Sequence, residues 1–375
     1  MNSKDKMNTV FSGASLNHFP VVVPYTDLLH RDRWEEITKQ PYWTYFEWLK
    51  MEPKEHCKEY ERFLEVLPFD WITPYWANSR EDRENMQIIK NENGTYLLKE
   101  RGIVREIPEN LHHLSLPPQE ERLVFTKEDI EEKVEVISAE TLIALGHLDY
   151  IEEAVKSIGD RCFITAAVSD TFIECYEYVG ISNLFTLLYE EPDLIHYLSE
   201  RILEKVIEEI KALGKVGVDA IFIEECLNTS DMLSPAFFNK FTMPYTRRIV
   251  AEVQSQNMKA ILAYFGGVAD RVEEINSLGA DGLLVETSMK NYVNDLTDIG
   301  GKLTGKTCLF GNIDPYGILE KSSDEVLKQK IEEQAAIGRK TMNGRFIIST
   351  GSPVTPATTI ERLRNYIDIG RQTAT

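Results

Sequence analysis

The chain has 375 residues, of which 43% are hydrophobic, so it can bury a sizeable core as one large domain or two ordinary ones. Acidic residues outnumber basic ones by 61 to 41, which gives a formal net charge of −20. This charge argues against a nucleic-acid backbone or an anionic membrane as the main partner, because both would repel the chain.

Cysteine usage and the N-terminus indicate where the protein works. The five cysteines are scattered and show no C-x-x-C spacing, which favours buried free thiols in a reducing compartment. No apolar run approaches the roughly 20 residues of a membrane span, and the polar N-terminus does not resemble a signal peptide. We therefore expect a cytoplasmic protein that does not bind a membrane.

The first two predicted strands lie at residues 21–25 and 69–76, where β-branched and aromatic residues cluster. Residues 86–107 then interrupt the pattern, because two strand-like runs flank Asn93-Gly94, a strong hairpin signal. We predict a β-hairpin insertion after the second strand, a ribbon that covers one rim of the site.

From residue 139 onward, helical segments and short apolar runs alternate along the chain. The whole sequence contains eight strand-like runs, marked by Val21, Trp71, Phe163, Ile221, Ile261, Leu283, Leu309 and Phe346. Eight parallel strands alternating with helices define a (β/α)8 TIM barrel, which is an α/β fold. Because no linker or further repeat divides the chain, we predict a single TIM-barrel domain over residues 1–375.

Carboxylates stand where two of these predicted strands end, which is where TIM barrels place catalytic residues. Glu224 and Glu225 follow one strand and Glu286 ends another. Side-chain alternation turns one member of the Glu224–Glu225 pair into the barrel and the other toward the helices. We predict catalytic roles for these acids; the plain alternative is a salt bridge to Arg247 or Arg248.

The stretch 308–315 delivers Asn312 and Asp314 to the end of a buried strand, just before a proline. We predict that Asn312 contacts substrate and that Asp314 is catalytic, although Asp314 equally suits a cap on the following turn. Tyr264 ends a further strand and is predicted to donate its hydroxyl in catalysis, the alternative being a packed aromatic ring.

The remaining candidates are polar or aromatic residues that shape a binding pocket. The predicted substrate-binding set is Tyr25, Asp70, Trp76, Asn312 and Ser352. Cys226 is expected to be an inert buried thiol, with a metal site shared with Glu225 and Glu286 as the alternative. We assign no metal ligand.

Several motifs resemble the uroporphyrinogen decarboxylase superfamily, a barrel family that also holds corrinoid-linked methyltransferases. The matching stretches begin with Asp219-Ala-Ile-Phe-Ile-Glu-Glu, Leu233-Ser-Pro-Ala-Phe-Phe, Met243-Pro-Tyr and Phe265-Gly-Gly, and continue with Gly279-Ala-Asp-Gly-Leu, Gly311-Asn-Ile-Asp-Pro and Gly351-Ser-Pro-Val-Thr-Pro. They cover residues 215–360 well and the N-terminal third loosely.

Two departures from the superfamily patterns narrow what the resemblance implies. The arginine-rich segment with which porphyrin decarboxylases grip carboxylates has no counterpart around residues 21–33. The thiol-methylating branch holds zinc with His-x-Cys and a later Cys, but the matching positions here are Ala263, Phe265 and Ser352. No histidine follows His196, so a His/Cys zinc site is not expected.

The resemblance therefore implies a methyltransferase that moves a methyl group between a small, methoxyaromatic substrate and a corrinoid (cobalamin) on a separate corrinoid protein, as in O-demethylation. Two alternatives stay open. One is a decarboxylase or other lyase acting on a small aromatic or pyrrolic acid, with a strand-end carboxylate as proton relay. The other is a barrel that has lost catalysis and only binds a ligand.

Overall fold

A sheet of parallel strands forms the centre of the computed structural model, which describes residues 1–114, 120–303 and 305–373. Seven strands are hydrogen-bonded in the order β1-β5-β6-β7-β8-β9-β10. Their bounds are β1 Trp71–Ile72, β5 Phe163–Ser169, β6 Ala220–Glu225, β7 Lys259–Tyr264, β8 Gly282–Val285, β9 Cys308–Phe310 and β10 Phe346–Ile347. All neighbouring pairs are parallel, so their C-terminal ends meet at one edge of the sheet.

The backbone around Val21 hydrogen-bonds to both outer strands of this sheet. Val22 N donates to Ile348 O at 2.9 Å, and Asp70 N donates to Val21 O at 3.0 Å. The sequence predicts a full strand here, but the structure forms only the single parallel bridge between Val21 and Ile348. Pro20 and Pro24 flank the bridge and lack the amide hydrogens that a longer ladder requires. The result is a curled seven-stranded α/β fold consistent with a TIM-like barrel.

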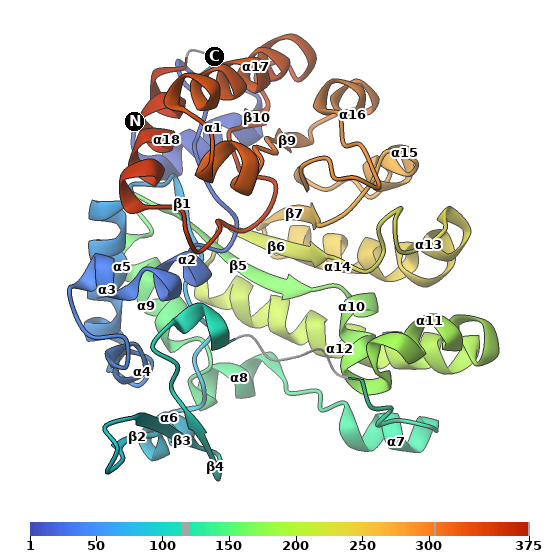
Figure 1. Cartoon of the computed structure of the whole chain (residues 1–375). Helices are drawn as coiled ribbons and strands as arrows, with labels where there is room; N and C mark the ends of the chain where they lie inside the picture. Colours follow the sequence, from blue (N-terminus) through green and yellow to red (C-terminus); the bar gives the residue numbers. More distant parts are fainter. Residues whose placement is uncertain (115–119, 304, 374–375) are drawn as a thin grey trace.

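Helices surround the curled sheet, and β5 and β6 run toward α10 and α13 (Figure 1). In the first half the bounds are α1 Ser3–Ser12, α2 Thr26–Asp32, α3 Trp34–Thr38, α4 Thr44–Trp48, α5 Pro53–Val66, α6 Arg80–Asn85, η1 Leu111–Leu114, α7 Lys127–Lys133, α8 Ala139–Leu145 and α9 Asp149–Ile158. In the second half they are α10 Thr171–Val179, α11 Ile181–Glu190, α12 Pro192–Val216, α13 Pro235–Phe241, α14 Met243–Ser255, α15 Val272–Asn276, α16 Leu296–Lys302, η2 Pro315–Glu320, α17 Asp324–Thr341 and α18 Ile360–Gln372. None of the described helices is long and apolar enough to cross a bilayer.

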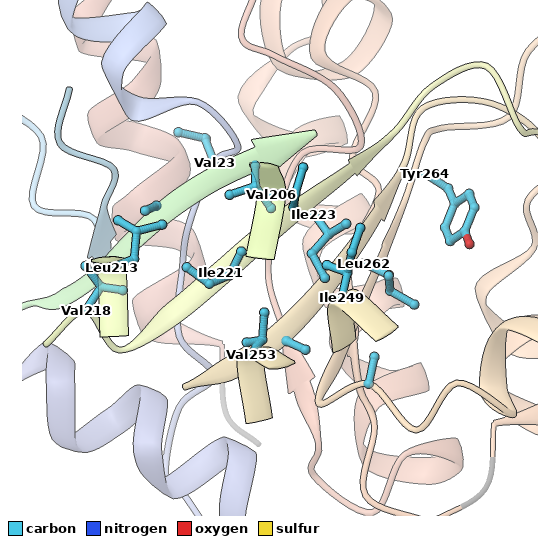
Figure 2. Close-up of a cluster of buried hydrophobic side chains, with 14 of the residues drawn as sticks. Val23, Val206, Leu213, Val218, Ile221, Ile223, Ile249, Val253, Leu262 and Tyr264 are labelled. Carbon is cyan, nitrogen blue, oxygen red and sulfur yellow. The ribbon is translucent and has the colours of Figure 1, made fainter. Parts of the chain in front are cut away.

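Alternation along the strands divides the buried side chains into two layers. The inner layer fills the interior of the curled sheet and includes Phe163, Phe222, Ala263, Leu284 and Phe310. The outer layer packs against the helices, and Figure 2 shows Ile221, Ile223, Leu262 and Tyr264 from the strands together with Ile249 and Val253 from α14. Residues two positions apart on a strand lie in the same layer. A side chain two positions after an inner-layer residue therefore also points into the interior.

Helix α1 covers the N-terminal ends of the strands, a feature that the sequence did not suggest. Met7, Val10 and Phe11 belong to the inner layer, and the Phe11 ring stacks on Phe163, the first residue of β5. Cys308 Sγ, at the start of β9, donates to Val10 O at 3.3 Å. Helix α1 therefore packs over this end of the interior.

A separate antiparallel sheet follows β1 and α6 in the chain. It contains β2 Gln87–Lys90, β3 Tyr96–Glu100 and β4 Ile103–Glu106 in that order. Gly94 lies in the turn between β2 and β3 with φ of 87°, a conformation that glycine adopts without strain. The Tyr96 ring stacks on Trp43 at 4.7 Å and thereby attaches this small sheet to the loop before α4.

Candidate active site

Glu224 is the carboxyl group that reaches the interior at the C-terminal end of the sheet. It lies two positions after Phe222, an inner-layer residue of β6, and shares its face of the strand. Ser169, which pairs with it across β5 and β6, donates its hydroxyl to Glu224 Oε2 at 3.3 Å. Of the two adjacent glutamates, only Glu224 is therefore placed to meet a ligand inside the sheet.

Tyr25 lies beside Glu224 and has an unusual backbone conformation. It precedes α2 with φ of 55° and ψ of 59°, in the left-handed region that a bulky residue rarely adopts. Its ring packs on Phe222 at 5.4 Å and on Phe265 at 5.6 Å, and its hydroxyl hydrogen-bonds to Glu224. Backbone strain of this kind concentrates at functional sites, because the surrounding structure must hold it.

The environment of Glu224 favours its neutral form. Burial raises the pKa of the Glu224 carboxyl, while the hydrogen bonds from Tyr25 and Ser169 act in the opposite direction without cancelling the effect. Burial and the nearby Glu224 also raise the pKa of the Tyr25 phenol well above its ordinary value. Glu224 is therefore suited to give up a proton, and the Tyr25 hydroxyl stays a hydrogen-bond donor.

Asp27 is a second acid in this region and was missed by the sequence analysis. Burial raises its pKa to about 6, and the charge of Glu224 adds to the effect. Its Oδ1 is buried and has no hydrogen-bond partner among the described residues. One sequence signal could have found it: Asp27 lies two residues after Tyr25, the end of the first predicted strand.

Glu286 forms the opposite part of the site. It lies two positions after the inner-layer residue Leu284, and its carboxylate accepts two hydroxyl hydrogen bonds. Ser352 Oγ donates to Oε1 at 2.7 Å, and Tyr292 OH donates to Oε2 at 2.5 Å. Glu286 thus joins the loops after β8 and β10. Glu286 and Ser352, which were both predicted as site residues, are therefore in contact.

Cys226 directly follows Glu225 at the end of β6. Burial raises the pKa of its thiol, and the nearby charges of Glu224, Asp170, Glu225 and Glu286 raise it further. A thiol with a raised pKa stays protonated, which makes it a poor nucleophile and a poor metal ligand. Glu225, the other proposed ligand, turns to the opposite face, and within the described ranges no three His, Cys, Asp or Glu side chains are grouped to hold a metal ion.

A depression of about 360 Å³ opens where β5 and β6 meet α10. Its lining includes Ser169 and Glu224 from the strands, Tyr176 and Glu177 from α10, and Lys205 from α12. This volume is in the range of small-molecule sites. Glu224 therefore lies on the wall of this depression, on the side that faces α10.

Glu225 and Tyr264 lie behind the sheet, so the prediction that they converge with Glu224 was wrong. Both are fully buried in the layer between strands and helices. Asn228 Nδ2 donates to Glu225 Oε2 and, at 3.2 Å, to Asp170 Oδ2. Burial and the charge of Asp170 raise the pKa of Glu225 well above its ordinary value. Tyr264 OH has no partner among the described residues.

Asn312 and Asp314 support the loops of the site. Asn312 Nδ2 donates to Glu286 O at 3.3 Å and its Oδ1 accepts from Gln334 at 3.0 Å, which uses the polar atoms that were predicted to contact substrate. Asp314 Oδ1 accepts from Tyr316 N at 2.9 Å and caps η2, which was the alternative for this residue.

Asp70 lies at the wrong end of the sheet for a substrate-binding residue. It precedes β1, and its Oδ1 accepts from Lys6 Nζ at 2.7 Å and from Ser3 Oγ at 2.8 Å, which ties α1 to the sheet. Trp76 does follow β1, and its Nε1 donates to Ala167 O at 3.4 Å over the end of β5. The alternative for Glu224 and Glu225, a salt bridge to Arg247 or Arg248, is not seen among the described residues: Arg248 pairs with Glu200, and Arg247 donates to Ser277 O at 3.0 Å.

The fold and the site define a class of protein: a curled parallel α/β sheet with acids and aromatic rings at its C-terminal edge, where barrel enzymes carry out their chemistry. The family model for uroporphyrinogen decarboxylase (URO-D) matches residues 112–373, more than half of the chain. The chain belongs to the uroporphyrinogen decarboxylase family.

Relatives share modest identity with this chain. The uroporphyrinogen decarboxylase of Prochlorococcus marinus (strain MIT 9312) is 22% identical over 256 residues, covering 66% of this chain and 70% of that protein. The uroporphyrinogen decarboxylase of Coxiella burnetii (strain Dugway 5J108-111) is 25% identical over 237 residues, 60% of this chain and 62% of that protein. The solved structure of a methyltransferase from Methanosarcina mazei superposes with a TM-score of 0.69 at 15% identity, covering 99% of this chain and 98% of that one. This last match shows a shared fold.

Proposed function

We propose that the chain is a single-domain enzyme that transfers a methyl group from a small methoxyaromatic substrate to a corrinoid carried by a separate protein. One observation carries the proposal. Glu224 is a buried carboxyl with a raised pKa, it faces the interior of the sheet, and the rings of Tyr25, Phe222 and Phe265 pack beside it. An aromatic wall beside a carboxyl group with a raised pKa suits an aryl ether.

The chemistry of an aryl methyl ether explains why such an acid is needed. The bond from the methyl carbon to the ether oxygen breaks, and the departing phenolate is a poor leaving group unless its oxygen is protonated. Glu224 supplies this proton, while Tyr25 and Ser169 orient the carboxyl through their hydrogen bonds. When bound, the corrinoid of the partner supplies the nucleophile that accepts the methyl group.

The rim of the site fits a protein partner. Met232, Met289 and Val293 follow β6 and β8 and are 42%, 55% and 66% exposed. Ser230 N donates to Gly267 O at 2.7 Å, and a Cβ on Gly267 would touch Tyr292, so the loops after β6, β7 and β8 adjoin each other. Exposed apolar side chains gathered beside a site favour contact with another protein. The fold match to a protein called a methyltransferase accords with this role.

The names of the sequence relatives supply the alternative, decarboxylation of a small acid. Such a substrate would need cationic side chains to hold its carboxylate. The segments that follow β5, β6 and β10, residues 170–180, 226–234 and 350–359, contain neither lysine nor arginine. The composition of these three segments favours methyl transfer, whereas the loops after β7 and β8 contain Arg271 and Lys290.

The test mixes the purified chain with a reduced corrinoid carrier protein and a panel of methoxyarenes. We expect the absorption spectrum of the carrier to change to that of the methylated form, with one phenol released for each methyl group transferred. No spectral change with any member of the panel would contradict the proposal. Release of carbon dioxide from an aromatic or pyrrolic acid without a corrinoid would instead establish the decarboxylase.

A further inference from the structure

The strand β4 is a free edge of the small antiparallel sheet. We propose that two copies of the chain associate through this edge: β4 pairs antiparallel with the β4 of a second copy, about a two-fold axis at Val104. The two three-stranded sheets then join into one continuous sheet. The association does not depend on the proposed reaction, because β4 belongs to a different sheet from the strands that carry the acids.

The edge is open on both faces. Among the described residues, β4 pairs with β3 alone, which leaves its other side without a neighbouring strand. Ile103 and Val104 are consecutive and therefore point to opposite faces of the sheet, and they are 63% and 56% exposed. The three strands lie at the margin of the molecule, apart from the central sheet (Figure 1). An exposed apolar edge of this kind favours pairing with a further strand.

The backbone groups that are free at this edge belong to Val104 and Glu106. Ile107 N donates to Tyr96 O at 2.9 Å, so the amide of Ile107 points toward β3. Amides of an antiparallel strand alternate between its two sides, so the amide of Arg105 also points toward β3, and those of Val104 and Glu106 point away from it. Neither of these two amides has a backbone partner among the described residues.

A second copy supplies the matching groups. With the two-fold axis at Val104, the Val104 amide of each copy meets the Val104 carbonyl of the other, which forms two reciprocal hydrogen bonds. Glu106 of each copy then lies beside Gly102 of the other. Such a contact uses the same patch on both copies and closes on itself, so the pairing stops at a dimer.

The charges along the edge favour a second copy in the antiparallel direction. Arg101 lies in the turn before β4 and Glu106 is the last residue of the strand, so the two ends carry opposite charges. Antiparallel pairing brings the basic end of each copy beside the acidic end of the other, whereas parallel pairing sets like charges together. Arg101 pairs with Asp82 at 2.7 Å, but its side chain is 57% exposed, so its guanidinium has further donors to offer Glu106.

The side chains of β4 also suit this register. Val104 lies across the axis from Val104 of the second copy, a β-branched pair of the kind that stabilises neighbouring strands. Ile103 of each copy lies opposite Arg105 of the other. Arg105 pairs with Glu100 of its own copy at 2.8 Å, so it brings no unpaired charge, and its aliphatic stem covers Ile103.

Sedimentation equilibrium of the full chain measures the association directly. We expect the mass to rise from 43.1 kDa toward twice that value as the protein concentration increases. In Val104→Pro the dissociation constant of the dimer should rise on the order of a hundredfold, because both hydrogen bonds at the axis are lost. The Val104 amide points away from β3, so the proline leaves the β3–β4 ladder intact and the circular dichroism spectrum unchanged. The control Val104→Thr keeps the amide and the β-branched shape, and it should remain dimeric.

A charge swap tests the two-fold register without proline. Because Val104 lies opposite itself, Val104→Lys sets two ammonium groups together at the axis and Val104→Glu sets two carboxylates together. Each variant alone should be monomeric at concentrations where the wild type is a dimer. An equimolar mixture of the two variants should regain the dimer, because each lysine then meets a glutamate.

Three results would overturn the proposal. A wild-type chain that stays at 43.1 kDa up to its solubility limit does not form this dimer. A dimer that survives Val104→Pro or Val104→Lys uses another surface. A mixture of the lysine and glutamate variants that stays monomeric, while the wild type is dimeric, shows that Val104 does not lie at the axis.

Discussion

At the scale of single residues, the pKa of Glu224 decides the pH range in which the site works. The proposed reaction needs the protonated carboxyl, so the rate falls as the pH rises through the pKa of Glu224. The hydrogen bonds from Tyr25 and Ser169 both lower this pKa, against the larger effect of burial. Removal of either donor therefore raises the pKa and extends activity toward alkaline pH.

The variant Tyr25→Phe tests this statement with little change in shape. The ring remains against Phe222 and Phe265, and only the hydroxyl that bonds to Glu224 is lost. We expect the alkaline limb of the methyl-transfer rate to move by about one pH unit to higher pH, together with a rate loss of roughly tenfold. An alkaline limb that stays in place or moves to lower pH would contradict the role given to Glu224.

Sequence reasoning identified the acids but not the direction in which each points. The alternation rule states that Glu224 and Glu225 face opposite sides, and it leaves open which one faces the interior. That choice depends on how β6 is rotated in the sheet, and Phe222 in the inner layer decides it. The same rotation places Tyr264 in the outer layer with Leu262 (Figure 2), and no local pattern in its strand records this.

At the scale of elements, Asn294 holds together three of the loops at the site. Its Nδ2 donates to Gly266 O and to Glu286 O, each at 2.9 Å, and its Oδ1 accepts from Val268 N at 3.1 Å. Its backbone carbonyl in turn accepts from Asn312 Nδ2 at 3.1 Å. Asn294 is 3% exposed, so the groups left behind by its removal would have little access to water.

The variant Asn294→Ala is therefore expected to lower the free energy of unfolding on the order of 2 kcal/mol, because buried backbone groups lose their partners. The measurement is denaturant unfolding, with Asn239→Ala on the exposed face of α13 as the matched control, which should change stability by less than about 0.5 kcal/mol. Equal stabilities for the two variants would show that the loops do not depend on Asn294.

The order of strands and helices from residue 139 onward was largely predictable, because each strand is a short apolar run and each long helix has a regular buried stripe. Finer features were not. The helical segment that begins at residue 139 divides into α8 and α9 at Gly146, whose φ of 87° ends the first helix. Helix α1 is short and polar in composition, and its role appears only through the packing of Met7, Val10 and Phe11.

At the scale of the whole molecule, the two ends of the sheet have different tasks. Helix α1 covers the N-terminal end, and Lys6 and Ser3 fix it to Asp70. The other end carries the acids and is rimmed by exposed apolar side chains, with Met289 on the loop after β8. A partner that delivers a large cofactor must therefore approach over this rim.

The variant Met289→Asp tests that approach. It adds charge to the rim without touching Glu224, so we expect the KM for the corrinoid protein to rise about tenfold while the KM for the methoxyarene stays unchanged. The control Asn8→Asp adds the same charge on the exposed face of α1, at the opposite end of the sheet, and should leave both constants unchanged. Equal KM values for the carrier in wild type and Met289→Asp would contradict docking at this rim.

The most direct test of the central claim, that Glu224 protonates the departing oxygen, is the dependence of the methyl-transfer rate on the acidity of the departing phenol. In the wild-type chain we predict a shallow dependence, because the acid assists poor leaving groups. In Glu224→Gln the rate for an ordinary methoxyphenol should fall on the order of a hundredfold or more, whereas an ether of a strongly acidic nitrophenol should lose little. The same loss for every leaving group would contradict proton donation by Glu224.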